Sequence, residues 1–276
     1  MKLMYPSLVR DLSEAVYRAE PAISQSGLRQ YKQAPTPLHF WARHYAPDRP
    51  YSPPTPAMIL GTVVHARLQL KEEGEFEKYY VKVPKGLRKT GESGKEFRKQ
   101  SGNRTLVSTP DWDLSLQMFK AVKRNKTAMK LLEDGIPEES FFFMHKGQKV
   151  KGRTDLRTPS GIIGDWKTTI NANPWGEGKD SFKKSIIQGR LDWQAAFYTK
   201  KMNDFIKDKN HDFVFIAIEK SYPFSCSLIT LDEADMKRAE EQVFQCLDEV
   251  CTRLNNKDFG TGYQERIWKV KLGEIK

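Results

Sequence analysis

The stretch that decides the fold is GRTDLRTPSGIIGDWKTT, residues 152–169. It has the form of a β-hairpin, because the turn-forming run TPSG separates two segments with strand character. Asp155 closes the first arm, and the second arm ends in the run Asp165, Trp166 and Lys167. Side chains of a strand alternate between its two faces, so Asp165 and Lys167 are expected to point the same way. The hairpin therefore predicts carboxylates and an ammonium group gathered at one edge of a sheet.

Such a group of side chains suits the hydrolysis of a phosphodiester. Hard divalent cations prefer oxygen ligands, which Asp155 and Asp165 would supply. The reaction also needs a cation near the attacking water, and Lys167 could fill that role. The alternative is a solvated hairpin with one surface ion pair. These three residues alone favour the alternative, because so short a pattern recurs by chance.

Charge and composition narrow the class of protein. The 276 residues include 46 Lys and Arg against 35 Asp and Glu, and the net charge of +11 favours an anionic partner such as nucleic acid or a membrane surface. No apolar run approaches the roughly 18 residues that a spanning helix needs, and we expect a soluble, cytoplasmic protein. The three cysteines, Cys226, Cys246 and Cys251, form no CxxC pair and argue against a thiolate metal cluster.

The periodicity of the chain predicts a mixed α/β fold. Helices are expected at 22–46, with an interruption around Pro35 and Pro37, and at 57–74, 110–135, 181–205 and 232–256. Strands are expected within 140–169, 212–220 and 224–231. Residues 83–105 are polar, basic and rich in glycine, which predicts a mobile loop with a short helix in it. The core order of helix, three strands, helix and strand indicates a mixed sheet with helices packed on it.

Further polar residues stand near the elements that flank the hairpin. His65 lies on the most apolar expected helix, Glu138 and Glu139 precede the first core strand, and Gln194 and Tyr198 are four residues apart on a helix face. Each has an ordinary explanation as a core histidine, a strand-flanking charge or a packing residue. Their order along the chain together with the acidic hairpin is hard to attribute to chance.

The ordered motifs resemble the PD-(D/E)XK nuclease superfamily and, more closely, its RecE (exonuclease VIII) branch of phages and prophages. LGTVVH, EES, GRTD, DWKTT and QAAFY match in that order, and ISQSGL near the N-terminus is also similar. One departure is that Arg153 and Thr154 stand where the branch usually has Arg-Pro before the aspartate. The likeness fades beyond about residue 220.

The resemblance implies an α/β fold with a PD-(D/E)XK, restriction-endonuclease-like core, in which helices flank a central mixed β-sheet. A single nuclease domain would span 1–276, with an N-terminal helical part at 1–56, the nuclease core at 57–220 and a C-terminal strand and helix at 221–276. Superfamily members with an iron-sulfur cluster need four cysteines, so no such cluster is expected.

The implied activity is a Mg²⁺-dependent, ATP-independent exonuclease, with Mn²⁺ expected to substitute. It would degrade one strand of linear double-stranded DNA from the 5′ end and leave a 3′ overhang for recombination by a RecT-like single-strand annealing protein. A homo-oligomer, with a ring as one form, would account for processivity. Two alternatives remain: a structure-specific or site-specific endonuclease on the same core, and a non-catalytic DNA-binding module.

The resemblance also implies roles for individual residues. The expected metal ligands are His65, Asp155, Asp165 and the backbone carbonyl of Trp166. Lys167 would orient or deprotonate the attacking water. Glu138, in slight preference to Glu139, would hold a second metal ion or its water, while Gln194 and Tyr198 would position the scissile strand.

Contacts to the rest of the DNA are expected from two regions. The candidate residues are Arg29 and Arg43 of the N-terminal helices and Arg88, Lys89, Arg98 and Lys99 of the basic segment. The basic segment is either a flexible phosphate clamp or a solvated linker. Phe40 and Trp41 could wedge or stack at a duplex fork, although at least one of two adjacent helical aromatics is expected in the core.

Overall fold

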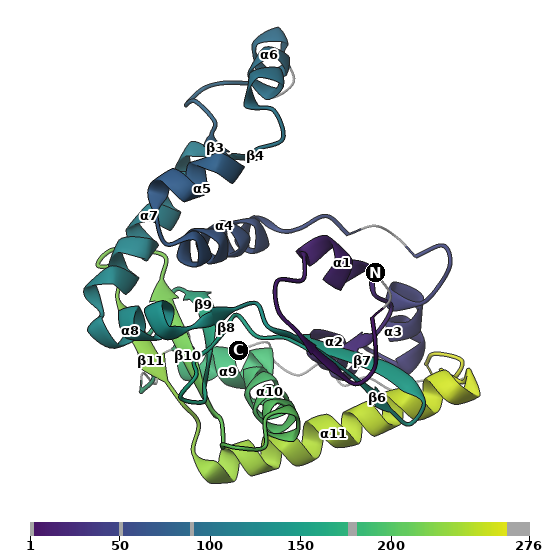
Figure 1. Ribbon diagram of the computed structural model, residues 1–276. Coiled ribbons are helices and arrows are strands. Elements are labelled where there is room, and N and C mark those ends of the chain that lie inside the picture. Colours follow the sequence, from purple (N-terminus) through teal and green to yellow (C-terminus); the bar gives the residue numbers. More distant parts are fainter. Residues whose placement is uncertain (1–2, 50–51, 89–90, 176–180, 264–276) are drawn as a thin grey trace, which may run out of the picture.

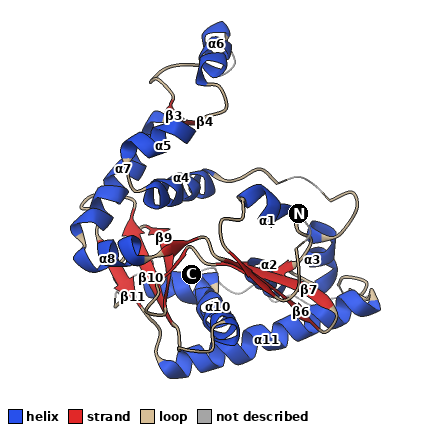
Figure 2. Ribbon diagram, viewed as in Figure 1, coloured by secondary structure: helices blue, strands red, loops and turns tan. Residues whose placement is uncertain are grey.

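The computed structural model describes residues 3–49, 52–88, 91–175 and 181–263 and has a mixed α/β architecture (Figures 1 and 2). The expected α/β class is thereby confirmed. The helices are α1 (Glu14–Ala19), α2 (Gln25–Gln33), α3 (Pro37–His44), α4 (Pro56–Leu70), α5 (Glu73–Tyr79), α6 (Glu92–Ser101), α7 (Thr109–Arg124), α8 (Lys126–Asp134), α9 (Phe182–Gly189), α10 (Leu191–Phe205) and α11 (Glu233–Asn256). The strands are β1 (Ser7–Val9), β2 (Ile23–Ser24), β3 (Tyr80–Lys82), β4 (Thr105–Val107), β5 (Ile136–Pro137), β6 (Ser140–His145), β7 (Gln148–Arg153), β8 (Leu156–Arg157), β9 (Ile162–Thr169), β10 (Asp212–Glu219) and β11 (Cys226–Ile229).

The strands form two larger sheets and one small ladder. One sheet has the order β1-β6-β7-β2, the second has the order β11-β10-β9-β8-β5, and β3 pairs with β4 alone. Both larger sheets are mixed, because β2/β7 and β9/β10 are parallel whereas their other pairs are antiparallel. The helix α11 runs along the bottom of both sheets in the view of Figure 1.

The expected hairpin at 152–169 is divided between the two sheets, which corrects the sequence prediction. Its first arm is broken: β7 ends at Arg153 and pairs with β6, whereas β8 contains only two residues and pairs with β9. Asp155 lies in the break and does not close an arm. Close packing explains the glycine near the end of β7, because a Cβ on Gly152 would lie 2.1 Å from the ring of Phe141. The acidic residues therefore stand where the sheets separate.

Two expected helices are also interrupted. Asn125 ends α7 and caps α8, since its side chain accepts a hydrogen bond from the N–H of Ala128. Arg190 adopts a φ of 49° and separates α9 from α10. The basic segment contains α6, in agreement with the short helix expected within a mobile loop. The strands β3 and β4 on either side of it pair with each other, and this part projects away from the body in Figure 1. We refer to residues 80–107 as the arm; the name does not concern the two halves of the hairpin at 152–169.

Apolar packing covers both faces of β9 and β10. Ile163 and Phe215 join the larger core beneath α10 and α11. Trp166 and Ile216 point the other way, into a second core under α4, α7 and α8. In the described ranges, no helix combines the length and apolar character needed to cross a membrane.

Candidate active site

The two aspartates of the divided hairpin face each other across neighbouring strands. Leu156 of β8 pairs with Gly164 of β9 in antiparallel register, so Asp155 comes opposite Asp165. The backbone N–H of Trp166 donates a hydrogen bond to Oδ2 of Asp155 over 2.9 Å. This bond holds the Asp155 carboxylate against the strand that carries Asp165.

The helix α4 brings His65 to the same place. Leu60 and Val64 of this helix lie in the second core, which fixes the rotation of the helix about its axis. Nε2 of His65 lies 3.1 Å from the carbonyl oxygen of Trp166, and its Nδ1 lies 3.5 Å from Oδ2 of Asp155. The imidazole therefore contacts two of the other expected metal ligands.

The helix α10 supplies Gln194 and Tyr198. Nε2 of Gln194 donates a hydrogen bond to Oδ1 of Asp165 over 2.6 Å. One turn later, the ring of Tyr198 packs edge-on against Phe141, with the centroids 5.6 Å apart. Burial raises the pKa of Tyr198 well above its ordinary value, so its hydroxyl stays protonated and can donate a hydrogen bond. The spacing of four residues therefore aims both side chains at the acidic group.

Asp165 is held in an electrostatically unusual setting. The side chain is buried, and the Lys167 ammonium on the same strand face lies against Oδ2. Burial raises the pKa of Asp165 to about 6; Lys167 lowers it, the Asp155 carboxylate raises it and His65 lowers it. No well-directed hydrogen bond reaches Oδ2 from the described residues. Further positive charge at this oxygen would stabilise the ionised carboxylate.

The adjacent acids Glu138 and Glu139 have different surroundings. Glu138 lines a cavity with Asp155, and its backbone N–H donates a hydrogen bond to the Asp155 carbonyl over 3.2 Å. Glu139 is completely buried and pairs with Arg157 and Arg10. The arginines and their hydrogen bonds lower the pKa of Glu139 although burial opposes them. The geometry therefore favours Glu138 over Glu139 as the acid that can reach a substrate.

A cavity of about 470 Å³ opens beside part of this group, whereas Asp165, Lys167 and Gln194 are not among its lining residues. His65, Glu138, Asp155 and Tyr198 line it. The lining also includes residues that the sequence reasoning did not select: Glu14, Tyr17 and Arg18 of α1, Gln69 of α4, Tyr80 of β3 and Arg153 of β7. The GRTD motif contained Arg153, but nothing local in the sequence indicated that α1 forms a wall of the site.

A protein-family profile described as "PDDEXK-like domain of unknown function (DUF3799)" matches residues 24–265. The chain belongs to this family. A crystal structure of a "putative exonuclease" from Eubacterium rectale is similar to the PDDEXK-like chain over 96% of this chain and 97% of that chain, with a TM-score of 0.65 and 14% sequence identity. At that identity the likeness concerns the fold alone. No curated protein matches the sequence. The family and the fold together identify a PD-(D/E)XK nuclease.

The donor atoms at the centre of the PDDEXK-like site suit a hard divalent cation. They comprise the Asp155 and Asp165 carboxylates, the Trp166 carbonyl and the His65 imidazole. Within the described residues, no three His, Cys, Asp or Glu side chains converge as a finished metal-ligand group. Mg²⁺ tolerates such a partial set, because it usually keeps several waters and binds through one or two carboxylates. The oxygen-rich donors therefore fit Mg²⁺ or Mn²⁺, and Asp165 Oδ2, which lacks a well-directed hydrogen bond, could accept a cation in addition to its ion pair with Lys167.

The expected DNA-binding residues lie outside this cluster. Arg29 donates to the carbonyl of Gly189 over 3.4 Å, and Arg43 lines a separate cavity at α3. Arg88 is exposed in the segment between β3 and α6, and Arg98 and Lys99 are exposed on α6. The remaining candidate, Lys89, lies outside the described residues.

The two aromatic candidates of α3 belong to the packing of the N-terminal helices. Phe40 is buried in the larger core, and Trp41 is partly buried against it. A wedge or stacking role for Phe40 at a duplex fork is therefore wrong, because its ring has no free face. Trp41 also packs near Phe259, with the ring centroids 6.4 Å apart.

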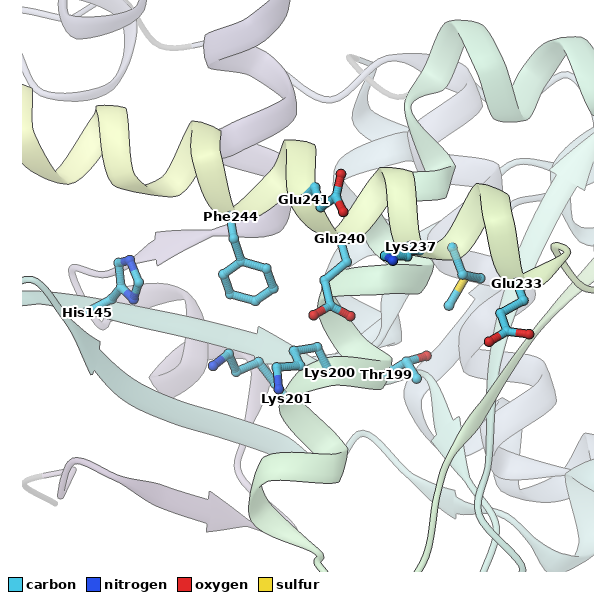
Figure 3. A pocket seen from close by; sticks show the side chains of 10 residues that line it. His145, Thr199, Lys200, Lys201, Glu233, Lys237, Glu240, Glu241 and Phe244 are labelled. Carbon is cyan, nitrogen blue, oxygen red and sulfur yellow. The ribbon is translucent and has the colours of Figure 1, made fainter.

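A larger cavity, of about 540 Å³, lies between α10 and α11 (Figure 3). Lys200 and Lys201 of α10 face Glu240 of α11 across it, beside Phe244. None of the aspartates or the histidine described above lines this cavity. Size alone does not define a site, so we assign the chemistry to the smaller cavity with the clustered acids.

Proposed function

We propose that this PD-(D/E)XK nuclease is a Mg²⁺-dependent, ATP-independent exonuclease that degrades the 5′-ended strand of linear double-stranded DNA. The observation that supports hydrolysis is the cluster of charged side chains at Trp166. Lys167 pairs with Asp165, and Asp155 accepts a hydrogen bond from the N–H of Trp166, the residue between Asp165 and Lys167. The RecE-like order of the motifs supports the exonuclease form and the polarity.

The chain's own residues divide the work. Asp155 and Asp165, with His65 and the Trp166 carbonyl, would hold the metal ion, which when bound supplies Lewis-acid polarisation of the scissile phosphate. Lys167, whose ammonium group lies against Oδ2 of Asp165, would orient the attacking water. Gln194 keeps the Asp165 carboxylate in place through its 2.6 Å hydrogen bond.

The size of the cavity supports a substrate of one strand at the reacting position. The volume of about 470 Å³ is small, so only part of a substrate would enter the cavity, beside Tyr17 and Tyr80. We propose that one unpaired strand enters it and that the enzyme requires a DNA end, because an end separates into single strands most easily.

The deciding experiment compares linear duplex labelled at either 5′ or 3′ end with covalently closed circles. We expect release of the 5′ label, a long residual 3′-ended strand, full activity without ATP and none in EDTA, while the circles survive. Release from 3′ ends first would refute the polarity. Nicking of closed circles as fast as end resection would favour an endonuclease, and no hydrolysis with Mg²⁺ or Mn²⁺ would favour a non-catalytic DNA-binding module.

The partners follow from the same proposal. The product, a long 3′ overhang, is the substrate of a RecT-like single-strand annealing protein. A homo-oligomeric ring around the remaining strand would keep the enzyme on its DNA. Sedimentation of the free protein measures its oligomeric state, and single-turnover trapping of the DNA complex measures its processivity. A monomer that degrades DNA processively would contradict the ring.

A further inference from the structure

Arg153 connects three separate segments at the edge of the active-site cavity. Its Nε donates to the Ser140 hydroxyl over 2.8 Å, its Nη1 pairs with Oε2 of Glu138 at 3.1 Å, and its Nη2 donates to the Leu12 carbonyl over 2.8 Å. The guanidinium carbon also lies 4.3 Å from the centroid of the Tyr17 ring. The side chain is 10% exposed. A planar group with five fixed donors can satisfy such a set, whereas an ammonium group cannot.

The register of the strands explains why these partners meet. Ser140 and Arg153 are direct partners in the β6/β7 ladder. Glu138 lies two residues before Ser140 and has a φ of 47°, in the left-handed region that a residue with a Cβ adopts only when its surroundings impose it. The guanidinium of Arg153, from the GRTD motif, thus contacts both Glu138 and Ser140 of the EES motif.

Glu138 needs such a restraint, because its side chain is 40% exposed and has several rotatable bonds. Without a partner, its carboxylate would sample many positions at the mouth of the cavity. Arg153 is itself immobilised by Ser140 on one side and by Leu12 and Tyr17 on the other. Leu12 and Tyr17 of the N-terminal segment therefore help to hold Arg153 in place.

We propose that Arg153 is a positioning residue that holds Glu138 at the metal site. The proposal rests on the proposed function in assigning Glu138 a role beside the metal. It differs from a purely structural role for Arg153, which would lower stability without a specific relation to Glu138.

The chain offers a matched control in Lys151, two residues earlier on the same face of β7. Its ammonium donates to the carbonyls of Tyr17 and Glu20 at 2.6 and 2.8 Å, and it lies 4.6 Å from the Tyr17 ring centroid. Lys151 thus anchors the same N-terminal segment without contacting Glu138. A Lys151→Met variant separates the anchoring of that segment from the positioning of Glu138.

The test is a double-mutant cycle of Glu138→Gln and Arg153→Gln, with Arg153→Lys and Lys151→Met, in variants whose fold is verified by circular dichroism. Calorimetric titration with Mn²⁺ and the Mg²⁺ concentration for half-maximal DNA degradation are the two readouts. We expect Glu138→Gln and Arg153→Gln each to weaken Mn²⁺ binding by about 10 to 100-fold. The double variant should stay within about twofold of Glu138→Gln. Arg153→Lys should recover only part of the loss, and Lys151→Met should retain the metal dependence.

Several results would overturn the proposal. Multiplicative losses in the double variant would mean that Arg153 acts independently of Glu138. Unchanged metal binding in Arg153→Gln or in Glu138→Gln, or an equal loss in Lys151→Met, would also contradict it. If the wild-type protein does not cleave DNA, the proposed function fails, but the Mn²⁺ titration still decides whether Arg153 and Glu138 act as one unit.

Discussion

The backbone N–H of Trp166 donates to Oδ2 of Asp155 over 2.9 Å, and this bond ties the break between β7 and β8, which carries Asp155, to the strand β9, which carries Asp165. The carbonyl oxygen of the same residue lies 3.1 Å from Nε2 of His65. Trp166 anchors this backbone because its side chain is buried in the second core. The position of the acids is therefore set by packing on the opposite face of β9, and the following predictions depend on it.

Asp165→Asn should abolish DNA degradation, by about 100-fold or more, because it removes a ligand charge from the metal site. The free energy of unfolding without metal should be unchanged or slightly higher, since burial raises the pKa of this carboxyl to about 6 and its ionised form is unfavourable there. Thermal unfolding in EDTA and degradation of labelled duplex measure the two effects. A variant that unfolds more easily would show that Asp165 is structural.

Lys167→Met should behave differently. The ammonium group contacts Asp165 and serves the attacking water, so turnover should fall by about 100 to 10,000-fold. Mg²⁺ binding should persist, because the carboxylates and the Trp166 carbonyl remain. Loss of Mg²⁺ binding in calorimetry would mean that Lys167 organises the ligands.

Gln194→Leu should reduce activity by about 10 to 100-fold, because the hydrogen bond that orients Asp165 is lost. Lys200→Ala on α10 serves as the control, since Lys200 lines the other cavity and does not contact the acids (Figure 3). Rates at saturating Mg²⁺ distinguish the two variants. Equal rates would remove Gln194 from the site.

Neutralising Arg88, Lys89, Arg98 and Lys99 together should weaken binding to duplexes of any sequence. Each lost phosphate contact reduces the slope of log K against log salt by about 0.9. Fluorescence anisotropy at several salt concentrations measures the slope. The control neutralises Lys200, Lys201 and Lys237 at the α10–α11 cavity. Equal slopes in the arm variant and the wild-type protein would make the basic segment a linker.

The stability of the protein should fall as the pH drops below about 6.5, in part because of His211. Burial lowers the pKa of His211 below its ordinary value of 6.5, with Arg157 and Lys209 adding to the effect. The unfolded chain therefore binds the proton first, so the contribution is complete above pH 6.5 and is lost as the pH falls through the folded pKa. His211→Gln should flatten this part of the profile of melting temperature against pH.

His39→Gln is the control for that measurement, because His39 is exposed on α3. Its profile should follow that of the wild-type protein. A profile of His211→Gln that keeps the full wild-type slope would show that other groups carry the acid sensitivity.

Local rules were sufficient for the residues whose relation is set by one strand or one helix. The period of two placed Asp165 and Lys167 together, and the spacing of four placed Gln194 and Tyr198 on one face of α10. The same local rules failed at Arg190, where a φ of 49° breaks the predicted helix. They failed again at the arm, whose parallel ladder joins residues 80–82 to 105–107.

The sequence by itself determined the α/β class, the family resemblance and the chemical identity of the acidic hairpin, because residue type and short-range periodicity carry that information. Only the tertiary structure decided that this hairpin is divided between two sheets, that Glu138 rather than Glu139 faces the cavity, and that Arg153 meets Leu12 across 141 residues of chain. Those outcomes depend on how the two cores and the N-terminal segment pack, because that packing decides where each of these side chains can lie. Packing between distant segments is a property of the whole chain, and no local pattern encodes it.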